Sequence, residues 1–228
     1  KIGDFWSMAM DSAKIEADGL KPIQPLLDKV NAITDVKSLV NTVSDLKKIG
    51  SNTLFSDYVY QDAKKSDAMS YNLSQGGLGL PEREYYFKTD SATINIRNEY
   101  VKYITQILTM AGEDATVAAT AAKNILALET KLATASRKIE DLRDPYKNYN
   151  KMAITDLGKM AGNIDWVSYL KNTGVQKVDS VIVGQPEFFI ALNDALTKTP
   201  ISDWKQYVRF NLIRDMTPVL PDNYGVAN

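Results

Sequence analysis

A segment dense in residues that shape the backbone, residues 74–87, divides the chain into two regions of different character. This glycine segment holds Gly76, Gly77, Gly79 and Pro81, followed by a double tyrosine. Glycine adopts backbone conformations that other residues avoid, and proline fixes its own φ angle. We therefore expect a tight turn, with Pro81 in the first turn of a short helix. If Gly79 lies at positive φ, Gly79→Val should destabilise the fold by more than the usual glycine-to-alanine difference of about 1 kcal/mol.

Before the glycine segment, the sequence predicts short helices and then a β-hairpin. Apolar residues recur every three or four positions over 4–17, 22–33 and 35–49, which predicts three amphipathic helices. Asp4 is the expected N-cap of the first helix, and Thr34 or Asp35 that of the third. β-branched and aromatic residues fill 53–60, and large apolar residues alternate with small or polar ones over 68–74. These two runs, separated by a polar turn, predict the hairpin.

After the glycine segment, the helical pattern is longer. Residues 91–111 and 114–136 predict two long helices joined at Gly112, which form an antiparallel helical hairpin. Glu129 falls on the same face of the second helix as its alanines and leucines. Residues 137–152 are highly charged and contain Pro145, which predicts an ordered loop with short helical turns.

The remaining residues predict short helices over 155–161 and 165–171, a strand over 178–183, a helix over 186–197, and a last long helix capped by Ser202 and ended by Pro218 and Pro221. The expected fold class is mainly α. It is a multi-helix bundle with a long antiparallel helical hairpin and one small β-hairpin, in one mostly helical domain spanning 1–228.

The chain contains no histidine and no cysteine. Histidine is the usual general base of nucleophilic hydrolases, and a catalytic zinc site nearly always takes His or Cys ligands. A zinc enzyme and a Ser-His-Asp enzyme are therefore both all but excluded within these residues. The formal net charge is −1 and no block of like charge occurs, which argues against a nucleic-acid partner. No apolar run is long enough to span a membrane.

Several short patterns associated with chemistry have a simpler structural explanation. Gly77-x-Gly79 lacks the third glycine of a dinucleotide loop, because Glu82 stands there, and the lysine of a phosphate loop is absent. The pattern Ser-x-x-Lys of Ser-Lys hydrolases lacks its companion motifs here. It occurs at Ser44/Lys47, Ser168/Lys171 and Ser202/Lys205.

An acidic group at Glu140, Asp141 and Asp144 lacks the spacing of a calcium loop. We expect these acids and Arg143 to form structural hydrogen bonds with neighbouring backbone. A carboxylate pair for glycoside hydrolysis stays open as an alternative, because its geometry is not visible in a sequence.

Two longer motifs follow one another along the chain. The first is Leu73-Ser74-Gln75-Gly76-Gly77-Leu78-Gly79-Leu80-Pro81-Glu82-Arg83-Glu84-Tyr85-Tyr86, and the second is Arg143-Asp144-Pro145 followed by Tyr149-Asn150-Lys151-Met152. Together they resemble the hallmarks of the neprilysin and endothelin-converting-enzyme family of zinc endopeptidases. The surrounding helices and hairpin also fit, so the resemblance covers essentially the whole chain. We interpret its positions as structural, with no catalytic, cofactor-binding or metal-binding residue among them: Gly77, Gly79, Pro81, Arg83, Tyr85, Tyr86, Arg143, Asp144, Pro145, Tyr149 and Asn150.

The resemblance implies a thermolysin-like catalytic domain and a mostly helical second domain, which enclose a cavity and restrict access to small peptides. The family's zinc ligands lie in a His-Glu-x-x-His helix and a downstream Glu-x-x-x-Asp of its C-terminal part, and none of them matches a position here. The arginine that holds the substrate's terminal carboxylate in that family falls upstream of Lys1. The chain therefore resembles the N-terminal helical part, with zinc expected only in the full-length protein.

The partners that the resemblance implies are the C-terminal catalytic domain of the same protein and peptide substrates. Animal members are rich in disulfides and anchored in membranes, whereas this chain has no cysteine. It is similar to a bacterial member, and the resemblance implies an extracytoplasmic location, in the periplasm, at the cell surface or secreted.

Three hypotheses about function follow. The first is a non-catalytic helical domain that shapes the cavity of such a peptidase. The second is a stand-alone helical binding or interaction module without enzymatic activity, and the third is a complete enzyme that uses carboxylates or a Ser-Lys pair. The chain begins at Lys1 without an initiator Met or a signal-peptide pattern, so we expect both ends to be cuts in a longer polypeptide.

Overall fold

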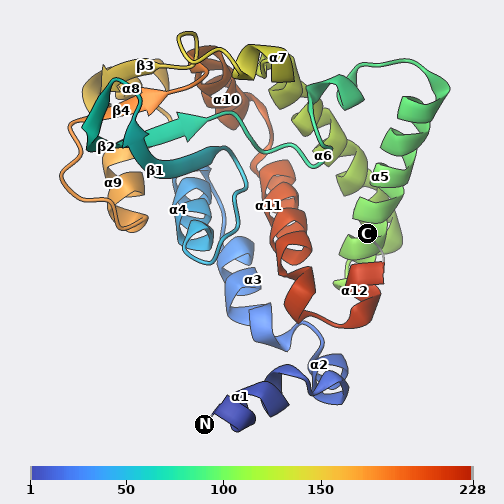
Figure 1. Ribbon diagram of the computed structural model, residues 1–228. Coiled ribbons are helices and arrows are strands. Elements are labelled where there is room, and N and C mark those ends of the chain that lie inside the picture. The colour runs from blue at the N-terminus through green and yellow to red at the C-terminus, as the bar shows by residue number, and fades with distance from the viewer. Residues whose placement is uncertain (1, 227–228) are drawn as a thin grey trace.

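The computed structural model describes residues 2–226. The chain begins with two short helices, α1 (Ile2–Ala9) and α2 (Ser12–Asp18), which project from the body of the molecule (Figure 1). The single helix expected over 4–17 is therefore wrong. The Asp11 side chain accepts a hydrogen bond of 3.0 Å from the backbone N–H of Lys14 and so begins a second helix, and Asp4 lies inside the first helix instead of capping it.

The next two helices match the prediction closely. The 3₁₀ helix η1 (Lys21–Ile23) leads into α3 (Gln24–Asn31), and α4 spans Val36–Lys47. Asp35 is the N-cap of α4 and forms a reciprocal capping box with Ser38. The buried side chains of α4 include Leu39, Val43 and Leu46, which lie on the face predicted from the sequence.

The predicted hairpin forms as β1 (Ser56–Asp62) and β2 (Lys65–Ser74), but it belongs to a larger sheet. Two short strands, β3 (Asn150–Ala153) and β4 (Ser180–Val183), complete four strands in the order β1-β2-β4-β3. β4 runs parallel to β2, with Tyr71 opposite Val181, and β3 pairs with β4 in the antiparallel sense. β4 confirms the predicted strand, whereas β3 lies where only a loop with helical turns was expected.

The long helical hairpin is confirmed. It consists of α5 (Ser91–Met110) and α6 (Ala115–Ala135), which pack against each other (Figure 1). Asp90 caps the first helix and Asp114 the second, and Gly112 makes the turn between them at φ 93°. Small buried side chains at Ala118 and Ala122 leave room for close helix approach.

The C-terminal half contributes α7 (Ile139–Leu142), α8 (Ile154–Met160), α9 (Trp166–Asn172), α10 (Pro186–Lys198), α11 (Ile201–Met216), η3 (Thr217–Val219) and α12 (Asp222–Val226). The expectation that Ser202 caps α11 is wrong, because Pro200 occupies the N-cap position and Ser202 is already helical. None of the described helices is both long enough and apolar enough to cross a membrane.

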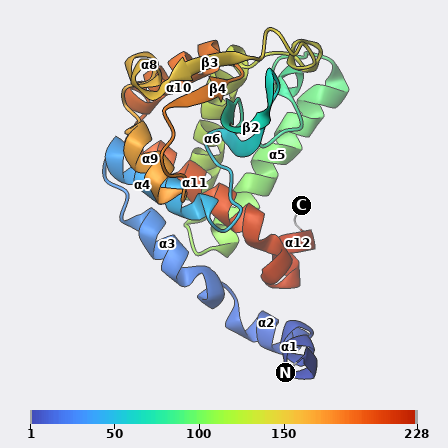
Figure 2. The same cartoon turned by 60° about the vertical axis from the view of Figure 1, so that its left-hand side comes forward.

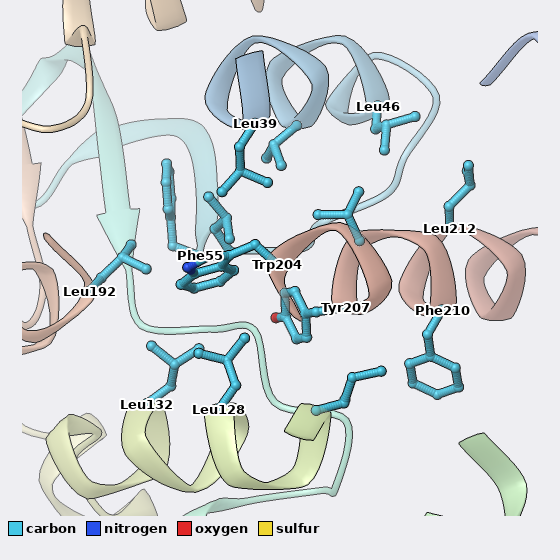
Figure 3. Close-up of a cluster of buried hydrophobic side chains, with 14 of the residues drawn as sticks. Leu39, Leu46, Phe55, Leu128, Leu132, Leu192, Trp204, Tyr207, Phe210 and Leu212 are labelled. Carbon is cyan, nitrogen blue, oxygen red and sulfur yellow. The ribbon is translucent and has the colours of Figure 1, made fainter. Parts of the chain in front are cut away.

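Helix α11 lies at the centre of the bundle and contacts α3, α4, α5 and α6. Its side chains Trp204, Tyr207 and Phe210 are completely buried. Figure 3 shows leucines of α4 and of α6 converging on it from opposite sides. The sheet covers one end of this bundle, above α4, α9 and α11, as a second view shows (Figure 2). The fold is therefore mainly α with one small sheet, as the sequence predicts.

Candidate functional site

The glycine segment leaves β2 and passes Tyr207 of α11. Gly77 has φ 74°, and a Cβ atom on it would lie 2.7 Å from the Tyr207 hydroxyl and 2.8 Å from the carbonyl oxygens of Thr53 and Leu54. The Tyr207 hydroxyl itself lies 2.5 Å from the Thr53 carbonyl oxygen and 2.7 Å from that of Gly77. Only glycine fits this position, for reasons of both conformation and space.

Gly79 is constrained in a different way from the one expected. Its φ is not positive, so the conformational reason proposed from the sequence is wrong. A Cβ atom on Gly79 would instead collide with the ring and hydroxyl of Tyr100. Glycine is therefore required at position 79 because the Tyr100 side chain of α5 lies so close to the backbone there.

The double tyrosine lies in the 3₁₀ helix η2 (Arg83–Tyr86), which Glu82 caps. Pro81 precedes this cap, outside the first turn in which the sequence placed it. Tyr86 is buried, and its hydroxyl accepts hydrogen bonds from the backbone N–H groups of Gly79 (3.1 Å) and Leu80 (3.0 Å). The same hydroxyl donates to Oε2 of Glu129 on α6, at 2.7 Å.

Arg83 and Tyr85 hold the segment against the helical hairpin. The Arg83 Nε donates to the carbonyl oxygen of Ala133 (3.2 Å), and its Nη1 pairs with Glu84 (2.9 Å). The Arg83 guanidinium also lies over the ring of Phe87, 5.1 Å from its centroid. Tyr85 packs its half-buried ring against the core. These contacts fit the interpretation of the motif as a structural joint.

The second motif forms a turn and then strand β3. Asp144 Oδ1 accepts from the backbone N–H groups of Tyr146 (2.9 Å) and Lys147 (3.1 Å), and this holds the pKa of Asp144 below its usual value. Arg143 and Pro145 are exposed. Within the described residues Arg143 makes no side-chain hydrogen bond or ion pair, so the expected pairing of Arg143 is not formed.

The end of this motif is tied to the sheet. The Tyr149 hydroxyl donates to Oδ1 of Asp62 at 2.9 Å, and Lys151 pairs with Oδ2 of the same carboxylate at 2.8 Å. Asn150 Nδ2 donates to the carbonyl oxygen of Val183 at 3.0 Å. The Lys151 hydrogen bond is the largest cause of a pKa of Asp62 well below its usual range.

A polar network that the sequence did not predict joins the two motifs. Gln75 exchanges two hydrogen bonds with the backbone of Arg137, of 3.0 and 2.7 Å. Gln185 donates to Oδ1 of Asn148 at 2.6 Å and accepts from the Gln75 backbone N–H at 2.8 Å. Arg137 also binds both carboxylate oxygens of Glu187, at 2.5 and 3.0 Å. These side chains come from four separate parts of the chain.

Two adjoining hollows lie where the motifs meet. One, of about 250 Å³, is lined by the glycine segment with Arg137 and Leu142. The other, of about 210 Å³, lies over the sheet beside Tyr58 and Asn148. Both share Gln75 and Leu142, so they form one surface. This surface, the motif junction, offers backbone groups, amides and two paired arginines, Arg83 and Arg137, to a bound molecule.

The motif junction contains no histidine or cysteine, because the sequence has neither residue. Among the described residues no group of three or more His, Cys, Asp or Glu side chains is placed to hold a metal ion. A zinc ion therefore does not fit the residues that the structure describes. Among the described residues, no Ser-x-x-Lys candidate shows a hydrogen bond between its serine and its lysine. Ser44 donates to the Asn41 carbonyl oxygen and Ser168 to Asp165, while Lys205 reaches the Asn31 carbonyl oxygen.

Buried Glu129 is the most perturbed carboxyl near the glycine segment. Its side chain is 0% exposed, and burial raises its pKa to about 7. The hydrogen bonds from Tyr86 and Tyr100 favour the charged form and so oppose this rise. The sequence placed Glu129 on the apolar face of its helix, and that position was the signal of a buried carboxyl.

Comparison with known proteins identifies the family of the chain. Residues 1–228 match the N-terminal model of peptidase family M13. Endothelin-converting enzyme 1 of Cavia porcellus is 25% identical over 98% of this chain and 31% of its own length. Neprilysin-3 of Drosophila melanogaster is 26% identical over 95% of this chain and 30% of its own length. The chain thus spans about a third of these relatives.

Solved structures show the same fold. The zinc metalloprotease ZMP1 of Mycobacterium tuberculosis, in complex with an inhibitor, has a TM-score of 0.93 and 26% identity, over 100% of this chain and 35% of that chain. PEPO of Lactobacillus rhamnosis has a TM-score of 0.80 at 18% identity, over 96% of this chain and 35% of that chain, and shows the fold alone. The chain belongs to peptidase family M13 and corresponds to the N-terminal region of that family.

Proposed function

We propose that residues 1–228 form the non-catalytic helical domain of a zinc metalloendopeptidase, which shapes and restricts access to a peptide-cleaving cavity. The zinc site of that enzyme lies in a C-terminal part outside this chain. The observation that carries the proposal is the match of the whole chain to the N-terminal family model, in a sequence without histidine or cysteine. A family of zinc peptidases needs ligands that this chain does not contain.

The proposed role is one of geometry. A domain without a metal or a general base contributes to peptide cleavage by limiting the size of the substrate and by holding it near the zinc. The motif junction suits a wall of such a cavity, because it joins both family motifs and presents hydrogen-bonding groups. The C-terminal catalytic domain is the proposed partner, and peptides are the proposed substrates of the complete enzyme, which we place outside the cytoplasm.

The first test is the gene sequence beyond Asn228. We expect a His-Glu-x-x-His motif within the next few hundred residues. A stop codon near Asn228 would favour the stand-alone binding module instead. Hydrolysis of peptides by the purified chain in the presence of a chelator would favour an independent enzyme that uses carboxylates or a Ser-Lys pair.

The second test addresses size restriction directly. The complete protein is incubated with a series of labelled peptides of increasing length and with an unfolded protein of several hundred residues. We expect cleavage of the short peptides and its loss for the unfolded protein, together with complete inhibition by a zinc chelator. Equal rates for peptides and for the unfolded protein would contradict a restricting role.

A further inference from the structure

The Glu129 carboxylate has no cation partner within ion-pair distance among the described residues, although it is completely buried. Its two oxygens accept hydrogen bonds from two tyrosines. The Tyr86 hydroxyl donates to Oε2 at 2.7 Å, and the Tyr100 hydroxyl donates to Oε1 at 2.9 Å. Two neutral donors are weak compensation for the water that an ionised carboxylate loses on burial.

The glycine segment is attached to this carboxyl chiefly through the Tyr86 hydroxyl, and the nearby backbone N–H of Gly79 favours the charged form of Glu129. The Tyr86 hydroxyl oxygen accepts from the N–H groups of Gly79 and Leu80, and its proton points to Glu129. A hydroxyl has one proton and two lone pairs, so the bonding capacity of Tyr86 is full. The position of two backbone amides therefore depends on a bond to Glu129.

Among the described residues, no charged group forms an ion pair with Glu129. On α11, Arg214 pairs with Asp215 at 3.1 Å and acts on Glu129 only through its charge, and Tyr207 lies near by as a neutral hydroxyl. On α10, which also packs against α6, Glu187 pairs with Arg137 and Asp194 with Lys198. The remaining titratable neighbours are Tyr86 of η2 and Tyr100 of α5.

Protonation of Glu129 changes the bond to Tyr100 and leaves the bond to Tyr86 in place. A neutral carboxyl must donate its proton, and Tyr86 has no lone pair left to accept it. The Tyr100 hydroxyl accepts no hydrogen bond from a described residue, so it can take the proton of Oε1 by rotating its own O–H. When Glu129 is neutral, its Oε2 therefore still accepts the hydrogen bond from Tyr86, which holds the glycine segment.

We propose that Glu129 is a proton-dependent latch, whose neutral form holds the glycine segment on α5 and α6 and whose ionised form favours local release of Gly79 and Leu80. Release of the segment lets water reach the Glu129 side chain. Hydration stabilises the ionised carboxylate much more than the neutral carboxyl. The segment also lines the hollow of about 250 Å³ at the motif junction, so the latch sets the shape of that hollow. This inference does not depend on the proposed function.

The sign of the pH dependence follows from linkage. Burial raises the pKa of Glu129 from 4.5 to about 7, so the closed state binds a proton that the open state releases. Opening becomes easier as the pH rises from 4.5 to about 7 and then changes no further. Each unit of difference in the pKa of Glu129 between the closed and open states changes the opening equilibrium constant tenfold. The whole difference therefore changes this constant by about two orders of magnitude.

The test is amide hydrogen exchange of the 228-residue chain, followed residue by residue by NMR between pH 5 and pH 8.5 and corrected for the intrinsic exchange rate. We expect protection of Gly79 and Leu80 to fall by about 100-fold across this range. The Glu129→Gln variant should show no such fall. Glu99→Gln is the matched control, because Glu99 is an exposed acid on α5, and it should behave like the wild type.

A second measurement keeps the proposal testable if Glu129→Gln does not fold. The wild-type chain with ¹³C-labelled glutamate is titrated, and the carboxyl signal of Glu129 is followed. A midpoint between pH 6 and 8 supports the latch. A midpoint below pH 5, or protection of Gly79 and Leu80 that stays constant with pH in the wild type, would overturn it.

Discussion

A Cβ atom on Gly79 would lie 1.7 Å from the hydroxyl oxygen of Tyr100, closer than two non-bonded heavy atoms can approach. Tyr100 cannot move away easily, because it is buried and its hydroxyl donates to Glu129. We expect Gly79→Ala to lower the free energy of unfolding by about 2–3 kcal/mol through overpacking. Urea denaturation followed by circular dichroism measures this loss.

Gly158 provides the control for that substitution. It lies inside α8, and nothing is within 4 Å of the position of its Cβ. Gly158→Ala should therefore stabilise the chain by up to about 1 kcal/mol through helix propensity. Equal effects of the two substitutions would mean that the packing around Tyr100 tolerates a methyl group.

Gly77 and Gly112 separate the cost of conformation from the cost of space. Both have positive φ, 74° and 93°, but only Gly77 has neighbours within 4 Å of its Cβ position. We expect Gly112→Ala to cost about 1 kcal/mol in unfolding free energy and Gly77→Ala to cost at least about 1 kcal/mol more. If the two costs were equal, the backbone near Thr53 would be able to move aside.

The bidentate pair of Arg137 and Glu187 links the motif junction to α10. Arg137→Lys keeps the charge but loses the planar fork and the Nη1 bond to Asn148 of 3.1 Å. We expect it to lower the unfolding free energy by about 1–2 kcal/mol. Lys102→Ala, which breaks an exposed pair with Glu99, should change the unfolding free energy by less than about 0.5 kcal/mol. If Arg137→Lys lowered the unfolding free energy as little as Lys102→Ala does, the polar network around Arg137 would not be a structural link.

Asp62 gives stability with the opposite pH dependence from Glu129. The pKa of Asp62 is lowered, chiefly by its hydrogen bond from Lys151, so its contribution is present above its unfolded value of 3.8 and is lost as the pH falls below it. We expect the urea midpoint of the wild type to fall between pH 5 and pH 2.5 more steeply than that of Asp62→Asn. Asp156→Asn, at an exposed pair on α8, should follow the wild type. Parallel curves for the wild type and Asp62→Asn would exclude this role.

We expect the purified chain to bind no stoichiometric zinc, because it lacks His and Cys and its described carboxylates form no group suited to a metal. Elemental analysis after gel filtration measures the metal content. One tightly held zinc per chain, retained through gel filtration, would contradict our interpretation of the ligands.

Local signals in the sequence predicted most of the helices. Asp35 caps the helix for which the sequence proposed it, because an N-cap bonds only to backbone within the next three residues. The break at Asp11 was missed because the apolar period continues through it. The N-cap of α11 is Pro200 and not Ser202. No side chain makes a capping hydrogen bond there, so the preference for serine at N-caps did not indicate where the helix begins.

Features that depend on distant residues could not be read from the sequence. β3 is four residues long and only half of them are polar or charged, and it exists through its pairing with β4. The bonds of Glu129 reach residues 43 and 29 positions away. The position of Glu129 on an apolar helix face indicated that it needs a polar partner, but the sequence could not show which residue that partner is. The positive φ considered for Gly79 is absent, and the constraint on this glycine comes from Tyr100, which is 21 positions away and could not be identified from the sequence.

The parallel pairing of β2 with β4 also fixes an order of events during synthesis. Tyr71 pairs with Val181, 110 positions later. At about 5–20 residues per second, a ribosome needs on the order of 5–20 s to make that length of chain. The β1–β2 hairpin therefore waits with one edge unpaired, while the α5–α6 hairpin, whose contacts are local, can already form. The sheet can therefore be completed only after β4 has been made, about four fifths of the way along the chain, and the central helix α11 follows it.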